Sequence, residues 1–343
     1  MNKLLRTLGT GLAGIMLVGA VHAQSAPEKK HLAIATTPSV ISYYPFEIAL
    51  AKGYFKDEGL DVERSMYAGG PQTLQALLGG SADMVVSAYS NTLTMAAKKQ
   101  SLQAFMLMIK SPGFVLGISR AGQAKYTSLK SLAGMKIGVT APGASTNMIL
   151  NTIARNNGVD PKSYSVIGVG ALSGAVAAVQ QGRVDALVGI DPTITMLSEA
   201  GQLKVVADMR TDAGTKEAVG SATYPEGSVI SMTEFVKKNP NTVQAVVNAM
   251  LRAQKFLQTA TAEQIMDALP KSYVTGDRAT FLKAIEHTRS VYAVDGRYDL
   301  EGAKAVLAVL AGSEPSVAAA QDRIDLPATF TNKFVDAAVV KQP

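Results

Sequence analysis

One short pattern occurs twice in this chain, and it limits the possible fold more than any other feature. Residues 74–86 read LQALLGGSADMVV, and residues 176–188 read VAAVQQGRVDALV. In both copies a helix-period apolar stretch ends at a glycine, and an aspartate then precedes an apolar run typical of a buried strand. The glycine and the aspartate keep the same offset of 102 positions (176 − 74) as the copies themselves. A repeat of this kind predicts two similar structural units in tandem.

The regions before the two copies extend this similarity. Apolar runs at 31–36 and 135–140 are expected to form strands, and helical patterns follow at 45–52 and 147–154. With one more strand before each copy, both halves read β-α-β-α-β, which predicts parallel sheets covered by helices. The 343 residues are enough for two such domains. We therefore predict two doubly wound α/β lobes and a helical C-terminal region, with helices at 241–257, 278–291 and 300–310.

The N-terminal residues have the pattern of a secretory signal peptide. Lys3 and Arg6 precede a short apolar run at 12–18, and Val21 and Ala23 are the small residues expected before a cleavage site. The apolar run is shorter than the roughly 20 residues that span a bilayer. We therefore expect residues 1–23 to be removed after Ala23 and the mature protein to reside in the periplasm.

Composition argues against several kinds of site. The chain has no cysteine, so disulfides, thiolate metal sites and thiol nucleophiles are impossible. Its three histidines (His22, His31 and His287) are scattered and give no zinc-ligand spacing. The formal net charge of +6 becomes +4 without Lys3 and Arg6 (6 − 2), and the basic residues form no stripe. We therefore expect no metal, no cofactor and no nucleic-acid partner.

The predicted strands end in loops of similar chemistry. In open α/β sheets, ligands bind at the carboxyl ends of the strands, and six loops here lie there: 37–44, 68–71, 87–91, 141–147, 170–173 and 191–193. They are rich in Gly, Ser, Thr, Asn and Tyr and precede helices, so backbone N–H groups and hydroxyls could bind an anionic group. The alternative is that the hydroxyls only cap the helices. The candidate ligand-binding residues are Ser39, Ser42, Tyr43, Gly70, Ser87, Tyr89, Asn91, Ser145, Thr146 and Asp191.

The stretch 48–62, IALAKGYFKDEGLDV, resembles the opening signature of the NMT1-like substrate-binding proteins, the group with the sulfonate, taurine and nitrate binders of ABC importers. The similarity continues in blocks through 131–139 to 182–185. It implies a type II periplasmic binding protein, a monomer whose lobes close over a small-molecule ligand, with an ABC permease and an ATPase as partners. It also implies that lobe one spans 31–112, lobe two spans 113–225, and 226–343 returns to lobe one and adds the C-terminal helices.

One position departs from the sulfonate binders. They commonly carry a tryptophan before an acid and a proline, whereas residues 189–192 here read GIDP. Asp191 could pair with a ligand amine, as in taurine, or cap the following helix. The missing tryptophan leaves the ligand open between an organic anion (a sulfonate, a taurine-like molecule or an aromatic carboxylate) and a neutral pyrimidine or thiamine-precursor heterocycle.

Enzyme alternatives have less support. Residues 168–174 contain GxGxxxG, which is not the dinucleotide-binding spacing GxGxxG. No GxSxG nucleophile elbow occurs. The fungal pyrimidine synthases share the fold that the resemblance implies, but they carry a cysteine-rich motif and a histidine that is consumed, and this chain has neither. We therefore expect a binding protein without catalytic residues.

Overall fold

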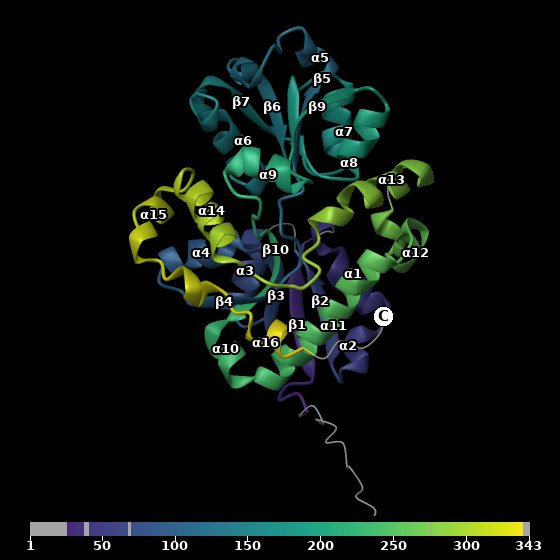
Figure 1. The fold of residues 1–343 in the computed structure, drawn as a ribbon, viewed down its shortest axis with the longest axis vertical. Coiled ribbons are helices and arrows are strands. Elements are labelled where there is room, and N and C mark those ends of the chain that lie inside the picture. The colour runs from purple at the N-terminus through teal and green to yellow at the C-terminus, as the bar shows by residue number, and fades with distance from the viewer. Residues whose placement is uncertain (1–25, 38–40, 68–69, 275, 339–343) are drawn as a thin grey trace, which may run out of the picture.

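Two five-stranded sheets organise the chain, one in each of two lobes (Figure 1). The computed structural model describes residues 26–37, 41–67, 70–274 and 276–338. The first sheet has the order β2 (Asp61–Met66), β1 (His31–Thr36), β3 (Met84–Ala88), β10 (Gly227–Met232) and β4 (Leu102–Leu107). The second has the order β7 (Ser165–Gly168), β6 (Lys136–Val139), β8 (Ala186–Gly189), β5 (Val115–Ser119) and β9 (Leu203–Asp208).

The two sheets share one topology. In each, three parallel strands are followed by one antiparallel strand, β10 or β5, which pairs with the remaining edge strand. The predicted β-α-β-α-β order is confirmed in both halves, and both sheets are mixed because β10 and β5 run against their neighbours. The helices of the two halves are α1 (Tyr44–Ala51), α2 (Tyr54–Asp57), α3 (Gly70–Leu78), α4 (Ser90–Ala97), α5 (Arg120–Gln123), α6 (Ser145–Asn156), α7 (Ser173–Gln180), α8 (Thr193–Glu199) and α9 (Asp212–Val219).

The repeated aspartate has the same role in both lobes. Asp83 Oδ2 accepts a hydrogen bond from the N–H of Ala33 in β1 (3.0 Å), and Asp185 Oδ2 accepts one from the N–H of Lys136 in β6 (2.8 Å). The second carboxylate oxygen of each pairs with a lysine Nζ, of Lys29 at 2.6 Å and of Lys125 at 2.8 Å. Each aspartate, which directly precedes β3 or β8, therefore ties the start of that strand to the neighbouring parallel strand of its sheet, β1 or β6.

The repeated glycine is explained by backbone conformation. Gly80 and Gly182 have φ angles of 75° and 64°, a region that side chains disfavour. Both end a helix and turn the chain toward the following strand, so a glycine is required at the same place in each copy.

Two segments of chain cross between the lobes. The first connects β4 to β5, and the second connects α9 to β10. They lie side by side, because the N–H of Tyr224 donates to the carbonyl of Lys110 (2.7 Å) and the N–H of Met108 donates to the carbonyl of Gly227 (2.7 Å). This paired crossing is the covalent connection between the lobes that a hinge requires.

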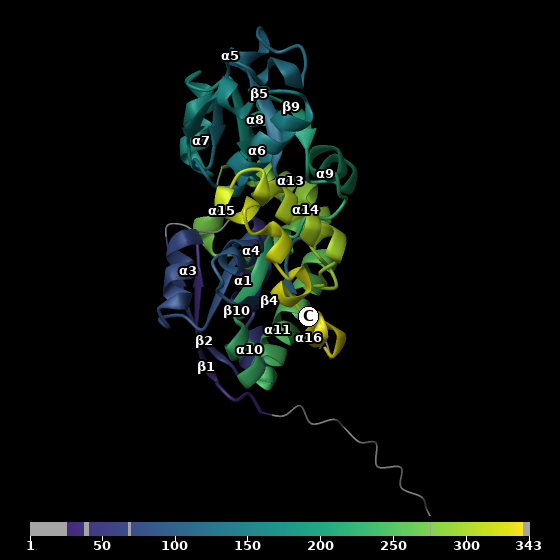
Figure 2. The same ribbon diagram turned by 90° about the vertical axis from the view of Figure 1, so that its left-hand side faces the viewer.

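The three predicted C-terminal helices are present, with bounds close to those expected, as α11 (Pro240–Thr259), α13 (Arg278–Thr288) and α14 (Leu300–Ala311). The same region contains further helices that were not predicted: α10 (Thr233–Lys238), α12 (Ala262–Ala268), α15 (Pro315–Ala318) and α16 (Lys333–Asp336). Figures 1 and 2 both place α13 and α14 at the level where the lobes meet. None of the helices in the described part of the chain is long and apolar enough to cross a membrane.

Helices α13 and α14 both lead to contacts with the second lobe. Lys283 of α13 forms an ion pair with Glu199 of α8, and Thr195 Oγ1 lies 3.1 Å from His287 Nδ1. On the other flank, Arg155 of α6 donates to Ser313 Oγ, just after α14 (3.5 Å). The C-terminal region therefore contacts the second lobe on both sides of the crossing segments.

Candidate functional site

A cleft of about 470 Å³ lies between the lobes, at the carboxyl ends of the parallel strands of both sheets. Five of the six predicted loops contribute to its walls, at Thr37, Gly70, Ser87, Ser145 and Gly170 among others. The sixth loop, 191–193, does not; Ile190 lines the cleft in its place. The volume is in the range of pockets that enclose small organic ligands.

On the first lobe, three predicted residues converge. Asn91 Nδ2 donates to Ser87 Oγ (2.7 Å), and a Cβ added at Gly70 would lie 3.7 Å from Asn91 Nδ2 and 3.9 Å from Ser87 Oγ. Because Gly70 has no side chain, it leaves the polar pair of Ser87 and Asn91 uncovered on that side. Ser42 and Tyr43 line the cleft beside it, and Ser42 is almost fully buried. Burial raises the pKa of the Tyr43 phenol, and the nearby Glu226 raises it further.

On the second lobe, the start of α6 faces the cleft. Ser145 and Thr146 both line it, and no side chain caps this helix. The Thr146 hydroxyl lies 2.7 Å from Thr140 Oγ1 and accepts a hydrogen bond from the Thr140 N–H (3.1 Å), which fixes its position. The alternative that these hydroxyls cap their own helix does not hold at α6, so the first N–H groups of α6 have no side-chain partner there.

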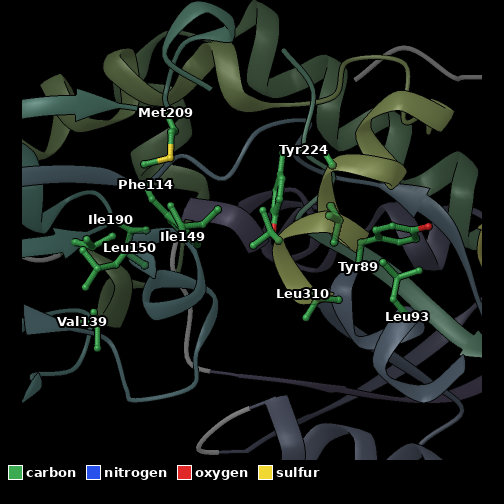
Figure 3. Packing of buried hydrophobic residues seen from close by; sticks show 14 of the residues in the cluster. Tyr89, Leu93, Phe114, Val139, Ile149, Leu150, Ile190, Met209, Tyr224 and Leu310 are labelled. Atoms are coloured by element: carbon green, nitrogen blue, oxygen red, sulfur yellow. The ribbon is translucent and has the colours of Figure 1, made fainter. Parts of the chain in front are cut away.

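Tyr89 does not line the cleft, contrary to the prediction from its loop position. Its side chain is fully buried, and its hydroxyl lies 2.6 Å from Thr329 Oγ1. Its ring packs against Tyr298 and Phe330, with centroids 5.5 and 6.3 Å away. Figure 3 shows it beside Leu93, within the apolar core. Tyr89 therefore anchors the C-terminal region to the first lobe.

Asp191 is also withdrawn from the cleft. It is fully buried, and its carboxylate accepts hydrogen bonds from the N–H of Thr195 (2.8 Å) and from Nη1 of Arg210 (3.0 Å). Of the two roles left open by the sequence, the structure assigns the capping role at the start of α8. Two other predicted features, Ser39 and the signal peptide at 1–23, lie outside the described residues.

The cleft also contains residues that sequence reasoning did not select. Its apolar wall is formed by Phe114, Met148, Ile190 and Leu310. In Figure 3, Phe114 and Ile190 lie together near Ile149, whereas Leu310 approaches from α14 on the other side. These side chains offer an apolar surface for the carbon skeleton of a ligand.

The most consequential of these residues is Glu226, in the second crossing segment. It lines the cleft and is 7% exposed. Burial raises the pKa of its carboxyl from 4.5 to about 7, and a hydrogen bond with the Ser145 side chain partly offsets this rise. Its Oε2 atom has no hydrogen-bond partner.

Charge in the cleft is therefore sparse and negative. Among the described residues that line it, Glu226 is the only one with a carboxyl group, and none carries a lysine, arginine or histidine side chain. The part of the chain that the structure describes also contains no group of three or more His, Asp or Glu side chains arranged to hold a metal ion.

Comparisons with known proteins place this geometry in context. Residues 41–263 match the model of the family described as NMT1/THI5 like. A solved structure from Bordetella bronchiseptica RB50 is 39% identical with a TM-score of 0.82, and the match covers 91% of this chain and 98% of that one. The alkanesulfonate-binding protein of Xanthomonas axonopodis pv. citri, solved with bound MOPS, is 18% identical with a TM-score of 0.67, covering 89% and 99%. That likeness shows the two-lobed fold of a periplasmic binding protein.

An enzyme is also among the relatives. The 4-amino-5-hydroxymethyl-2-methylpyrimidine phosphate synthase THI13 of Saccharomyces cerevisiae is 26% identical over 220 residues, which is 63% of either protein. The proteins to which this chain is similar are thus named for a binding function in one case and for a synthetic one in the other.

Proposed function

Because the chain belongs to the NMT1/THI5-like family, we propose that it is a periplasmic solute-binding protein that captures a small organic molecule between its lobes and delivers it to an ABC importer. The observation that carries this proposal is the convergence of loops from both sheets on one cleft. A ligand that contacts both walls stabilises the closed arrangement in proportion to its extra contacts there. An integral permease and a cytoplasmic ATPase would be the partners of the monomer.

A small organic anion is the first class of ligand. Uncapped N–H groups at the start of α6 and the hydroxyls of Ser145 and Thr37 could receive a sulfonate or a carboxylate. The lack of a cationic side chain among the described lining residues disfavours a multiply charged anion. A taurine-like molecule fits this balance, since it carries one anionic group and one amine.

A neutral amino-heterocycle is the second class, and Glu226 favours it. A buried carboxyl with a free oxygen can pair with the amino group of a pyrimidine, while Phe114, Ile190 and Leu310 contact its ring. The aminopyrimidine after which the yeast relative is named is a molecule of this kind.

Capture without chemistry is part of the proposal. A nucleophilic mechanism needs a hydroxyl or thiol activated by an adjacent base. The chain has no cysteine, and the described lining contributes hydroxyls without a histidine or lysine; the one carboxyl there, of Glu226, adjoins the Ser145 hydroxyl, so recovery of the ligand unchanged is the measurement that tests this part of the proposal. We therefore propose binding without a covalent step, in contrast to the synthase named among the relatives.

The test is a thermal-shift screen of the purified mature protein with sulfonates, taurine, nitrate, aromatic acids and pyrimidines, followed by calorimetry and chromatography of the recovered ligand. We expect stabilisation by a solute that is recovered unchanged. Asn91→Leu fills the polar side of the cleft and should abolish binding, whereas Asn156→Leu, an exposed position on α6, should not. Consumption of the ligand, or equal binding by both variants, would contradict the proposal.

A further inference from the structure

Glu226 is held at a fixed place between the lobes. Its N–H donates to the carbonyl of Ile109 in the first crossing segment (3.3 Å), and its carbonyl accepts from the N–H of Tyr89 (2.7 Å). Its side chain instead reaches Ser145, at the start of α6 on the second lobe. The carboxyl therefore lies between the crossing segments and the start of α6, in the lining of the cleft.

The carboxyl is incompletely paired. It is more than nine-tenths buried, yet Oε2 has no hydrogen-bond partner. The titratable groups facing it are the phenols of Tyr43 and Tyr224, and neither supplies a positive charge. A buried acceptor left unpaired destabilises a protein, so the missing partner is expected to come from outside the chain.

The same carboxyl disfavours a simple anion. It is bonded to Ser145, the first residue of α6, and so lies where the N-terminus of that helix would attract a negative ligand group. A sulfonate or carboxylate there would face Glu226 directly. Whenever Glu226 is ionised, as it increasingly is above its pKa of about 7, like charges in this buried site repel strongly, so the ligand should present a hydrogen-bond donor at this position.

Resting on the proposed function, we propose that Glu226 determines specificity by selecting solutes with a nitrogen-bound hydrogen directed at its free oxygen, either a primary amine or an amino-substituted heterocycle. Such a group would satisfy Oε2, and Phe114 and Ile190 would contact the rest of the molecule. Solutes of the same shape that lack this nitrogen-bound hydrogen are bound less well.

Matched ligand pairs test this directly. Calorimetry would compare taurine with 2-hydroxyethanesulfonate, and 4-amino-2-methylpyrimidine with 2,4-dimethylpyrimidine, in which a methyl group of similar size replaces the amino group. We expect the amino member of at least one pair to bind about tenfold to a hundredfold more tightly, the effect of a hydrogen bond to a buried charged or strongly polar group. In Glu226→Gln the preference should fall to about twofold or less, because the side-chain shape is kept and the carboxyl is lost.

A matched control is Glu234→Gln, which removes an exposed glutamate on α10 and should leave the preference intact. Circular dichroism would verify folding of both variants, and the ligand pairs test the wild-type protein without any substitution. Equal affinity for the two members of both pairs, or an undiminished preference in Glu226→Gln, overturns the inference. Tight binding of a solute without nitrogen, such as ethanesulfonate, overturns it too and leaves the proposed transport function standing.

The pH dependence of binding distinguishes the two classes of ligand, a cationic amine and a neutral amino-heterocycle. A cationic amine requires an ionised Glu226, so its affinity should rise between pH 5 and pH 8. An aminopyrimidine shares one proton with the carboxyl, so its affinity should fall as the pH rises above about 7, the pKa of Glu226. An affinity independent of pH for both kinds of ligand contradicts a role for Glu226.

Discussion

Replacing Glu226 by glutamine should change how the stability of the ligand-free protein depends on pH. The carboxyl has a pKa near 4.5 when the chain is unfolded and about 7 in the folded protein, where burial disfavours the charge. Folding therefore favours the protonated form, and the free energy of unfolding of the wild-type protein decreases as the pH rises from 4.5 through 7. At about 1.4 kcal/mol per pH unit the loss is about 3 kcal/mol, of which about 2.5 kcal/mol falls between pH 5 and pH 8.

Glutamine has the same shape and does not titrate, so the variant should escape this loss. Urea unfolding followed by circular dichroism at pH 5, 6, 7 and 8 would measure both proteins. The free energy of unfolding of Glu226→Gln, relative to wild type, should increase by about 2.5 kcal/mol from pH 5 to pH 8. Glu234→Gln should show no such change, since that glutamate is exposed. Parallel pH profiles for wild type and Glu226→Gln would refute the assignment of a buried, proton-binding carboxyl.

Three further substitutions test the assignments at neighbouring positions. Tyr89→Phe should lower the free energy of unfolding by about 1 kcal/mol through loss of the bond to Thr329, with unchanged ligand affinity by calorimetry; a large affinity loss would return Tyr89 to the cleft. Arg210→Met leaves Asp191 buried without its cation and should cost about 3–5 kcal/mol in urea unfolding; a cost under about 1 kcal/mol would contradict the pairing. Gly122→Ala places a Cβ 2.1 Å from the Asp185 carbonyl oxygen, and differential scanning calorimetry should show a loss of about 1–3 kcal/mol; an unchanged melting temperature would exclude that contact.

The architecture could be predicted from sequence because its determinants are local. The glycine, the aspartate and the apolar spacing of the repeat each report on a short stretch of chain, and Gly80 and Asp83 have the same backbone roles as Gly182 and Asp185. The loop positions followed from strand order alone, because the carboxyl ends of parallel strands meet at one edge.

The directions of individual side chains could not be predicted in this way. Tyr89 directly follows β3, as expected for a cleft residue, but its ring turns toward Tyr298, Thr329 and Phe330, more than 200 positions away. Asp191 is likewise withdrawn by Arg210, which belongs to a different strand connection. Such partners are decided by tertiary packing and leave no local pattern.

Glu226 escaped selection for another reason. The predicted ligand-binding loops follow parallel strands, whereas this residue lies before an antiparallel strand, in a segment expected only to connect the lobes. One sequence feature could have pointed to Glu226: the six loops contain no lysine or arginine, and the second crossing segment contains a single acidic residue. Residues of hinge segments thus need to be considered as lining residues whenever two lobes enclose a site.

The contacts on either side of the crossing segments limit how the lobes can move. Seen as in Figure 1, α14 meets α6 on one flank and α13 meets α8 on the other, with the crossing segments between them. Tilting the upper lobe toward either flank would compress one contact and separate the other, so sideways rocking is opposed in both directions. Tilting in the perpendicular plane affects the α6–α14 and α8–α13 contacts equally. Of the two ways in which the upper lobe can tilt, these contacts therefore oppose sideways rocking more than the tilt in the perpendicular plane.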